Sequence, residues 1–179
     1  MVEIASPGEI MNDIRLVPLD KMHCEQLLKL WGNENVMKYT YLDTLSNVKD
    51  VEFRVDYWLT SFMDKAFVNN FVIMCEDKVI GVAGFPILKK NPFKCGIYYQ
   101  LMEEYHGKGI GTYIVGLMKG MIFERFHMGE IVTRCTMKNH ASKRVLEKNG
   151  FICAGIEKEG FERNGEKDDV VKYVFIKKL

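Results

Sequence analysis

The feature that most constrains this chain is a glycine-rich loop that lies between an apolar strand pattern and a long apolar helix pattern. Glycines stand at positions 107, 109 and 111 in the stretch "YHGKGIG". Glycine in regular structure costs stability, so alternating glycines indicate a sharp backbone turn or a close approach to a ligand. A strand, a glycine turn and a helix start together form an anion site, because the first N–H groups of the helix lack intrahelical partners.

A long helix is predicted directly after this loop. Apolar residues recur at spacings of three and four, which is typical of one buried helix face. These residues are Ile110, Tyr113, Ile114, Leu117, Met118, Met121 and Ile122. Gly116 and Gly120 lie off this apolar stripe, and each costs about 1 kcal/mol against alanine in a helix. We therefore expect close packing against another element at these two positions.

The known phosphate-binding loops can be compared with this stretch one at a time. A Walker A loop needs GxxxxGK[ST], which the chain lacks. A dinucleotide fingerprint needs a third glycine where Thr112 stands, and it follows an early parallel strand rather than a meander. The pattern [Q/R]-x-x-G-x-[G/A] remains, read over residues 106–111, with Lys108 adding positive charge. The alternative is a tight turn that needs a single glycine.

The rest of the chain predicts alternating short elements. We expect a strand at 14–17, helices at 24–31 and 48–62, and a hairpin of strands at 70–76 and 79–88. Further strands are expected at 95–102, 130–137, 151–156 and 170–176, and a helix at 139–150. This order predicts an α/β (α+β) fold with a mixed, mostly antiparallel central sheet and flanking helices. We expect a single domain over residues 1–179, with 1–12 as a loose leader.

Composition excludes several functional classes. A net charge of +1 argues against a general nucleic-acid or membrane-surface binder, and a hydrophobic content of 47% argues against disorder. No apolar run reaches a membrane span of about 18 residues, and the start lacks a signal-peptide pattern. Five separated cysteines without a CxxC motif suggest no metal site and indicate reduced core residues of a cytoplasmic protein. A nucleophilic cysteine is the alternative, and no local signature supports it.

Three segments, in order, resemble the GNAT superfamily of acyl-CoA N-acyltransferases. "YHGKGIG" is similar to the coenzyme A pyrophosphate loop of that family, and "KNHASKRVLEKNGF" to its next motif. "GFERNGEKDDVVKY" resembles the closing hairpin of the ribosomal-protein N-acetyltransferase (Rim-type) branch, and "RLVPLD" and "LWGNENVMKY" resemble the start of that branch. One departure is His106, where the family usually has arginine or glutamine. Backbone N–H groups hold most of the phosphate contacts, so we expect binding to survive, with His106 able to donate from either ring nitrogen.

The resemblance implies that acetyl-CoA lies in a cleft where strands 95–102 and 131–137 splay apart. The pantetheine arm would pair with free backbone near Leu101 and Met102, where an N–H group can also stabilise the oxyanion. Backbone of residues 106–112 would take the pyrophosphate, and Asn139 would bond to the pantetheine. The implied set for coenzyme A is Leu101, Met102, His106, Gly107, Lys108, Gly109, Ile110, Gly111, Thr112, Asn139 and Ser142.

Acetyl transfer requires a neutral amine and a proton for the departing thiolate. Deprotonating a lysine-like amine at pH 7 costs roughly 4–5 kcal/mol, whereas an α-amine costs about 1 kcal/mol. Glu103 resembles the general base of the ribosomal-protein-serine branch, and Ser142 matches its general acid. The alternatives remain open: Glu103 as a solvated loop residue, and Ser142 as a helix hydroxyl that only touches the cofactor. The tyrosine that many relatives use instead is replaced here by Leu146.

The acceptor is expected to contact residues 33–45 and the C-terminal hairpin. Tyr39, Tyr41 and Asp43 are the candidates for substrate binding, and a surface loop with scattered aromatic residues is the alternative. Asp169 is expected to order the hairpin.

The expected function is transfer of an acetyl group from acetyl-CoA to a primary amine by direct attack through a tetrahedral intermediate. The amine would belong to a protein N-terminus, a polyamine or another small molecule. A non-catalytic acyl-CoA-binding regulatory module is the alternative from a different class. The oligomeric state stays open, with a homodimer as one alternative.

Overall fold

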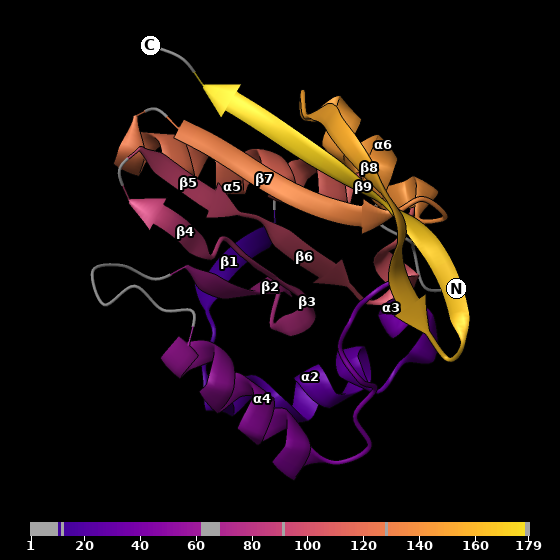
Figure 1. Ribbon diagram of the computed structural model, residues 1–179. Coiled ribbons are helices and arrows are strands. Elements are labelled where there is room, and N and C mark those ends of the chain that lie inside the picture. Colours follow the sequence, from indigo (N-terminus) through magenta and orange to yellow (C-terminus); the bar gives the residue numbers. More distant parts are fainter. Residues whose placement is uncertain (1–10, 12, 62–68, 91, 128, 178–179) are drawn as a thin grey trace.

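Two sheets joined by one bent strand form the centre of the molecule (Figure 1). The computed structural model describes residues 11, 13–61, 69–90, 92–127 and 129–177. The expected leader, residues 1–12, lies outside the described residues apart from Met11. The helices are α2 (Cys24–Trp31), α3 (Glu34–Met37), α4 (Val48–Ser61), α5 (Ile110–Phe126) and α6 (His140–Lys148), with 3₁₀ helices η1 (Lys21–His23) and η2 (Glu103–Tyr105). The strands are β1 (Ile14–Pro18), β2 (Asn70–Cys75), β3 (Lys78–Gly84), β4 (Ile87–Lys90), β5 (Phe93–Gly96), β6 (Tyr98–Leu101), β7 (Gly129–Thr136), β8 (Ile152–Arg163) and β9 (Glu166–Lys177).

The sheet is mostly antiparallel, as the sequence predicts. One sheet has the order β1-β2-β3-β6, and the other has the order β4-β5-β7-β9-β8. Every pair is antiparallel except β5 with β7, which run parallel. The expected α/β fold with flanking helices is therefore confirmed.

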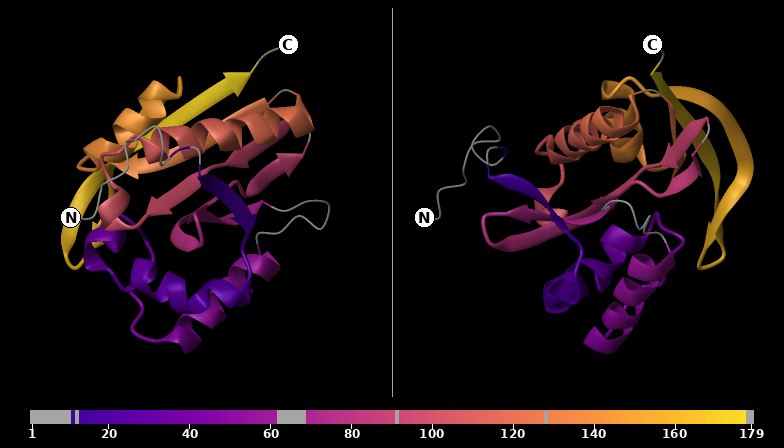
Figure 2. Two further views of the ribbon diagram at one scale, coloured as in Figure 1. Left: turned by 180° about the vertical axis from the view of Figure 1, so that it is seen from behind. Right: turned by 90° about the vertical axis from the view of Figure 1, so that its left-hand side faces the viewer.

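Helices cover both faces of the sheet, and strand alternation sends side chains to each (Figure 2). On β2, Phe71 and Ile73 join the core under α5, whereas Val72 between them joins the core under α2 and α4. The first core also contains Ile110, which begins the apolar stripe of α5. Burial on both faces explains why the strand segments read as continuous apolar runs.

Local signals in the sequence set the ends of several elements. Asp20 accepts from the Met22 N–H in a capping box before α2, and Gly32 is the C-cap residue of that helix. The turn between β8 and β9 lies at Asn164 and Gly165, both of which have a positive φ.

Several element boundaries differ from expectation. The strands expected at 151–156 and 170–176 extend to the hairpin turn, as β8 and β9. The strand expected at 79–88 is interrupted at Pro86, because proline cannot donate to a ladder, and it becomes β3 and β4. The strand expected at 95–102 is divided at Ile97 into β5 and β6. The stretch 33–45, for which no element is expected, contains α3, a helix of four residues capped by the Asn33 side chain.

Candidate active site

The boundary change at Ile97 lets two strands diverge, because the two halves of the bent strand pair with different partners. β5 pairs with β7 up to the register pair Gly96 and Val132, whereas β6 pairs with β3. At the point of divergence, the Thr133 hydroxyl donates to the Ile97 carbonyl at 3.0 Å. Beyond this point β6 and β7 run apart toward their C-terminal ends, as Figure 1 shows. The splayed pair of strands expected from the sequence is present.

The backbone groups of β6 that face away from β3 belong to Tyr99 and Leu101, and of these the Leu101 carbonyl accepts from His106. The Met102 N–H donates to the Ile80 carbonyl at 2.8 Å, which makes Met102 part of a hydrogen-bonded pair of the β3–β6 ladder. Bonded and non-bonded pairs alternate in antiparallel ladders, so the backbone of Tyr99 and Leu101 faces away from β3, toward β7. The expectation that Met102 offers free backbone is therefore wrong, since its carbonyl also accepts from the Tyr105 N–H at 3.0 Å. Tyr99 takes its place.

The glycine loop follows β6 and η2 and leads into the start of α5. Gly107 and Gly109 have φ values of 74° and 81°, a left-handed conformation that favours glycine. A Cβ atom at Gly107 would meet no described atom within 4 Å, so the backbone there is open to approach. Gly109 is the N-cap residue of α5 and supplies no side-chain cap, so the first N–H groups of this helix are available to an anion.

The third glycine of the motif has a different role. A Cβ atom at Gly111 would lie 3.1 Å from Tyr99 Cε2 and 3.3 Å from Val145 Cγ2, inside the interface of α5, α6 and β6. Gly111 is buried and helical, so packing against Tyr99 accounts for it rather than close approach of a phosphate. Its backbone N–H still lies in the first turn of α5, where an anion can reach it.

His106 and Lys108 hold the loop through their side chains. His106 Nε2 donates to the Leu101 carbonyl at 2.9 Å, which ties the loop to the end of β6. The Lys108 ammonium lies 5.4 Å from the centroid of the Tyr105 ring. The expected phosphate bond from His106 is therefore restricted to its other ring nitrogen, Nδ1.

The two other glycines of α5 are not explained by close packing, contrary to expectation. A Cβ atom at Gly116 would make only an ordinary contact, 3.5 Å from Asn149 Oδ1, and one at Gly120 would meet no described atom within 4 Å. Nothing in the structure explains glycine at position 120.

Gly120→Ala is therefore expected to stabilise the protein by about 0.5–1 kcal/mol, because alanine restricts the unfolded chain and favours the helix. A thermal melt should show a melting temperature higher by about 2 °C for a chain of this size. Gly111→Ala is the contrasting variant, since its methyl group would press on Tyr99, and it should lower the melting temperature. A lower melting temperature for Gly120→Ala would contradict the open environment.

Ser142 lies at the start of α6, next to Tyr99 of β6 and Cys135 of β7. Asn139 caps this helix, and its Oδ1 accepts from the Ser142 N–H at 3.1 Å. The Asn139 oxygen is thus used within the protein, which leaves its Nδ2 group for the pantetheine. Burial raises the pKa of Tyr99 to about 12 and that of Cys135 to about 11, and a hydrogen bond with the Ser142 side chain opposes the rise in each. Ser142 therefore faces two neutral, protonated groups.

Glu103 follows β6 and is held in place by residues about seventy positions earlier in the chain. Asn33 Nδ2 donates to its Oε2 at 3.2 Å, and Asn35 Nδ2 lies 3.2 Å from Oε1 and 3.3 Å from Oε2. These two hydrogen bonds, the one from Asn33 first, hold the pKa of the Glu103 carboxyl below its usual value. The carboxylate is exposed and oriented, and it remains charged at neutral pH.

The three expected acceptor residues make contacts with groups other than the Glu103 carboxylate. The Tyr41 hydroxyl donates to the Gly160 carbonyl at 2.7 Å, and its ring packs edge-on against Phe161. The Lys38 ammonium lies over the Tyr39 ring, and the Asp43 carbonyl accepts from Arg54 at 2.7 Å. The sequence pattern missed Asn33, Asn35 and Tyr99, although the cap at Asn33 was a readable signal.

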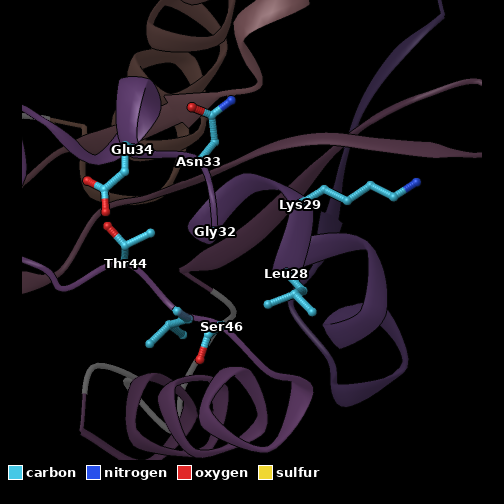
Figure 3. Close-up of a pocket in the computed structure, with 8 residues that line it drawn as sticks. Leu28, Lys29, Gly32, Asn33, Glu34, Thr44 and Ser46 are labelled. Atoms are coloured by element: carbon cyan, nitrogen blue, oxygen red, sulfur yellow. The ribbon is translucent and has the colours of Figure 1, made fainter.

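An open pocket of about 760 Å³ lies beside Asn33, between the end of α2, α3 and residues 44–46 (Figure 3). Figure 3 shows the Glu34 carboxylate and the Thr44 hydroxyl pointing toward each other on one side of it. Lys29 points away from them, on the far side of the pocket. Asn33 thus borders this pocket and also holds Glu103.

The remaining expectations concern cysteines and the closing hairpin. Cys24, Cys95 and Cys135 are buried free thiols, but Cys153 is exposed on β8, so the expectation of five core cysteines is wrong for this residue. Burial raises the pKa of Cys95 to about 12, which argues against a thiolate nucleophile there. Asp169 orders the hairpin as expected, through Lys158 at 2.7 Å and the Glu159 N–H at 3.0 Å. Within the described part of the chain, no helix combines the length and apolarity that crossing a membrane requires.

Comparison with known proteins identifies relatives of this arrangement. The family model described as "Acetyltransferase (GNAT) domain" matches residues 13–152. The ribosomal-protein-serine acetyltransferase of Escherichia coli (strain K12) is 31% identical over 115 residues, and this match spans 63% of each chain, slightly less than two thirds.

Two solved structures share the fold at low sequence identity. A ribosomal L7/L12 α-N-protein acetyltransferase in complex with coenzyme A aligns with a TM-score of 0.81 at 22% identity, covering 93% of this chain and 96% of that one. The spermidine N-acetyltransferase of Vibrio cholerae in complex with coenzyme A and spermine aligns with a TM-score of 0.79 at 19% identity, covering 92% and 96%. At these identities the likeness supports the fold alone.

Proposed function

The chain belongs to the acetyltransferase (GNAT) family, and from that premise we propose that it transfers the acetyl group of acetyl-CoA to a primary amine. The observation that carries this proposal is the divergence of β6 and β7 beside the open N-terminus of α5. A divergence of strands with free backbone suits an extended amide-containing arm, and the adjoining helix start suits a pyrophosphate. The strand β6 and the helix α5 follow each other in the chain, and the loop that contains Gly107 and Gly109 connects them.

The residues present fit two parts of coenzyme A, the pyrophosphate and the pantetheine arm. The left-handed backbone at Gly107 and Gly109 lets phosphate oxygens approach the N–H groups of the first turn of α5. The outward backbone of Tyr99 offers an N–H and a carbonyl to the pantetheine amides, and Asn139 Nδ2 offers a further donor, whereas the Leu101 carbonyl already accepts from His106. Acetyl-CoA, when bound, supplies the activated thioester.

Two side chains are proposed to act in the reaction at that thioester, the Glu103 carboxylate and the Ser142 hydroxyl. Glu103 would bind the incoming amine and accept its proton, and Ser142 would hydrogen-bond the departing sulfur. The Leu101 N–H is the donor that β6 offers to a developing oxyanion. Because its hydrogen bonds keep Glu103 ionised, we expect the rate above pH 5 to follow the protonation of the amine rather than that of Glu103.

The acceptor is proposed at the level of its chemistry. One relative is named for ribosomal-protein serine, and one structural neighbour for spermidine, so both protein α-amines and polyamine amines belong in the test. The experiment incubates the protein with acetyl-CoA and a panel of both amine types and measures free thiol. Release of thiol with one type identifies the acceptor class. Tight coenzyme A binding without release for any amine would favour the non-catalytic acyl-CoA-binding module.

Glu103→Gln should lower kcat/KM by about 30-fold for a lysine-like or polyamine acceptor and by only about 3-fold for an α-amine. The difference arises because the first kind of amine holds its proton more tightly at pH 7. Glutamine keeps the size of the side chain and most contacts with Asn33 and Asn35. Steady-state kinetics with both acceptors at pH 7 and pH 9 provide the test, and the defect should shrink at pH 9. An equal loss for both acceptors at both pH values would argue against a role as base.

A further inference from the structure

The tip of the β8–β9 hairpin is fastened to the segment that precedes α4. Arg163, the last residue of β8, has a side chain that is only 16% exposed, although it stands next to the turn. Its Nη1 donates to the Leu42 carbonyl at 2.7 Å and to the Thr40 carbonyl at 3.2 Å. Its Nη2 donates to the Thr44 hydroxyl at 3.2 Å and lies 3.7 Å from Glu34 Oε2. A planar guanidinium with five donors suits such a fork of acceptors, which an ammonium cannot reproduce.

A second hydrogen bond joins the hairpin to the same segment, and it uses a carbonyl that an irregularity in β8 leaves outside the ladder. The β8–β9 register shifts between Glu157 and Phe161, so Gly160 has no partner in the register, and its carbonyl accepts from the Tyr41 hydroxyl. Such bulges commonly redirect groups at the end of a ladder. The hairpin curves toward α3 in Figure 1, consistent with these contacts. Tyr41, expected to bind substrate, is therefore part of this attachment.

The attachment continues to the carboxylate of the candidate site through three consecutive residues. Asn33, Glu34 and Asn35 form the cap and first turn of α3. The outer two donate to Glu103, and the middle one faces Arg163. One short helix turn thus separates the Arg163 guanidinium from the Glu103 carboxylate. Since α3 has only four residues, its position depends on such contacts rather than on its own stability.

We infer that Arg163 is a positioning residue for the acceptor site: it fixes the first turn of α3, which holds the Glu103 carboxylate where an amine acceptor is bound. This inference rests on the proposed function only for the identity of the ligand. Arg163 contacts segment 34–44 and none of the residues assigned to coenzyme A. Its loss should therefore affect the acceptor and leave the acyl donor unchanged.

The test compares Arg163→Met and Arg163→Lys with Lys167→Met. Lys167 pairs with Glu159 at 2.8 Å in the same hairpin and does not contact segment 34–44, so it controls for the loss of a hairpin charge. Arg163→Met should raise the KM for the amine that the acceptor panel identifies by about 10-fold, or about 1.4 kcal/mol. Arg163→Lys should show a smaller rise in the same parameter. The KM for acetyl-CoA should stay within about 2-fold for all three.

A double-mutant cycle separates positioning from a general structural effect. If Arg163 acts through Glu103, Arg163→Met should change acceptor KM by less than about 2-fold in a Glu103→Gln background. Full additivity of the two substitutions would overturn the inference, as would a matching rise in acetyl-CoA KM. If Arg163→Met fails to fold, the same cycle with Arg163→Lys decides.

A readout without catalysis keeps the inference distinct from the proposed function. In the ligand-free protein, the side-chain amide NMR resonances of Asn33 and Asn35 should shift in Arg163→Met and stay in place in Lys167→Met. Unchanged amide resonances in Arg163→Met would refute the positional link even if the enzyme is active. Shifted resonances in a protein that acetylates no amine would support the link and reject the proposed activity.

Discussion

Replacing Gly109 by aspartate is expected to weaken coenzyme A binding by about 1000-fold. The side chain would stand at the N-cap of α5, where the proposed pyrophosphate meets the first helical N–H groups. Two like charges about 4 Å apart repel by about 4 kcal/mol at an effective dielectric of about 20, which corresponds to about three powers of ten in affinity. Aspartate tolerates the left-handed backbone at this residue better than most side chains, so we expect the fold to persist.

Isothermal titration calorimetry with coenzyme A measures this loss. Two controls separate charge from geometry. Gly120→Asp adds the same charge to the exposed side of α5 and should leave affinity within about 2-fold, since its separation from the first turn exceeds a Debye length of about 8–10 Å. Gly109→Ala adds only bulk and strain, and it should fall between the wild type and Gly109→Asp. An unchanged affinity in Gly109→Asp would refute the assignment of the loop to the pyrophosphate.

Replacing Ser142 by alanine is expected to lower kcat by about 100-fold, which is the lower end of the range for a positioned proton donor. The Ser142 N–H would keep its bond to Asn139, because that cap uses the backbone, and α6 should therefore stay in place. Burial keeps the neighbouring Tyr99 and Cys135 protonated at neutral pH, so neither replaces the hydroxyl as an anion would. The hydroxyl is the group that the variant removes.

Steady-state kinetics distinguish the two roles that the sequence leaves open for Ser142. A fall in kcat with a nearly constant KM for acetyl-CoA indicates an interaction made in the transition state. A rise in that KM with unchanged kcat indicates a cofactor contact only and would contradict the donor role. Ser142→Thr retains a hydroxyl and should recover part of the rate, whereas Ser142→Ala should not.

Most of the fold follows from local patterns. The apolar stripe of α5, the capping box at Asp20, the Asn139 cap and the Asn164–Gly165 turn each act within a few residues, and the long helix and the helix at 139–150 lie where the sequence predicts them. One difference from the expected fold lies where a long-range partner decides. Ile97 divides a strand because β3 and β7 take its two halves, and no local signal marks that division.

The candidate site divides in the same way. The left-handed glycines at 107 and 109 and the helix start behind them are properties of one short stretch, so the sequence by itself determined this loop geometry and, through the resemblance of the motif, the family to which the chain belongs. Only the tertiary structure decided that Gly111 serves packing, that the Met102 N–H is bonded to β3, and that Asn33 and Asn35 hold Glu103 while Arg163 contacts Glu34 between them. These facts depend on contacts between residues tens of positions apart, which packing of the two sheets and the hairpin creates and which no local periodicity encodes.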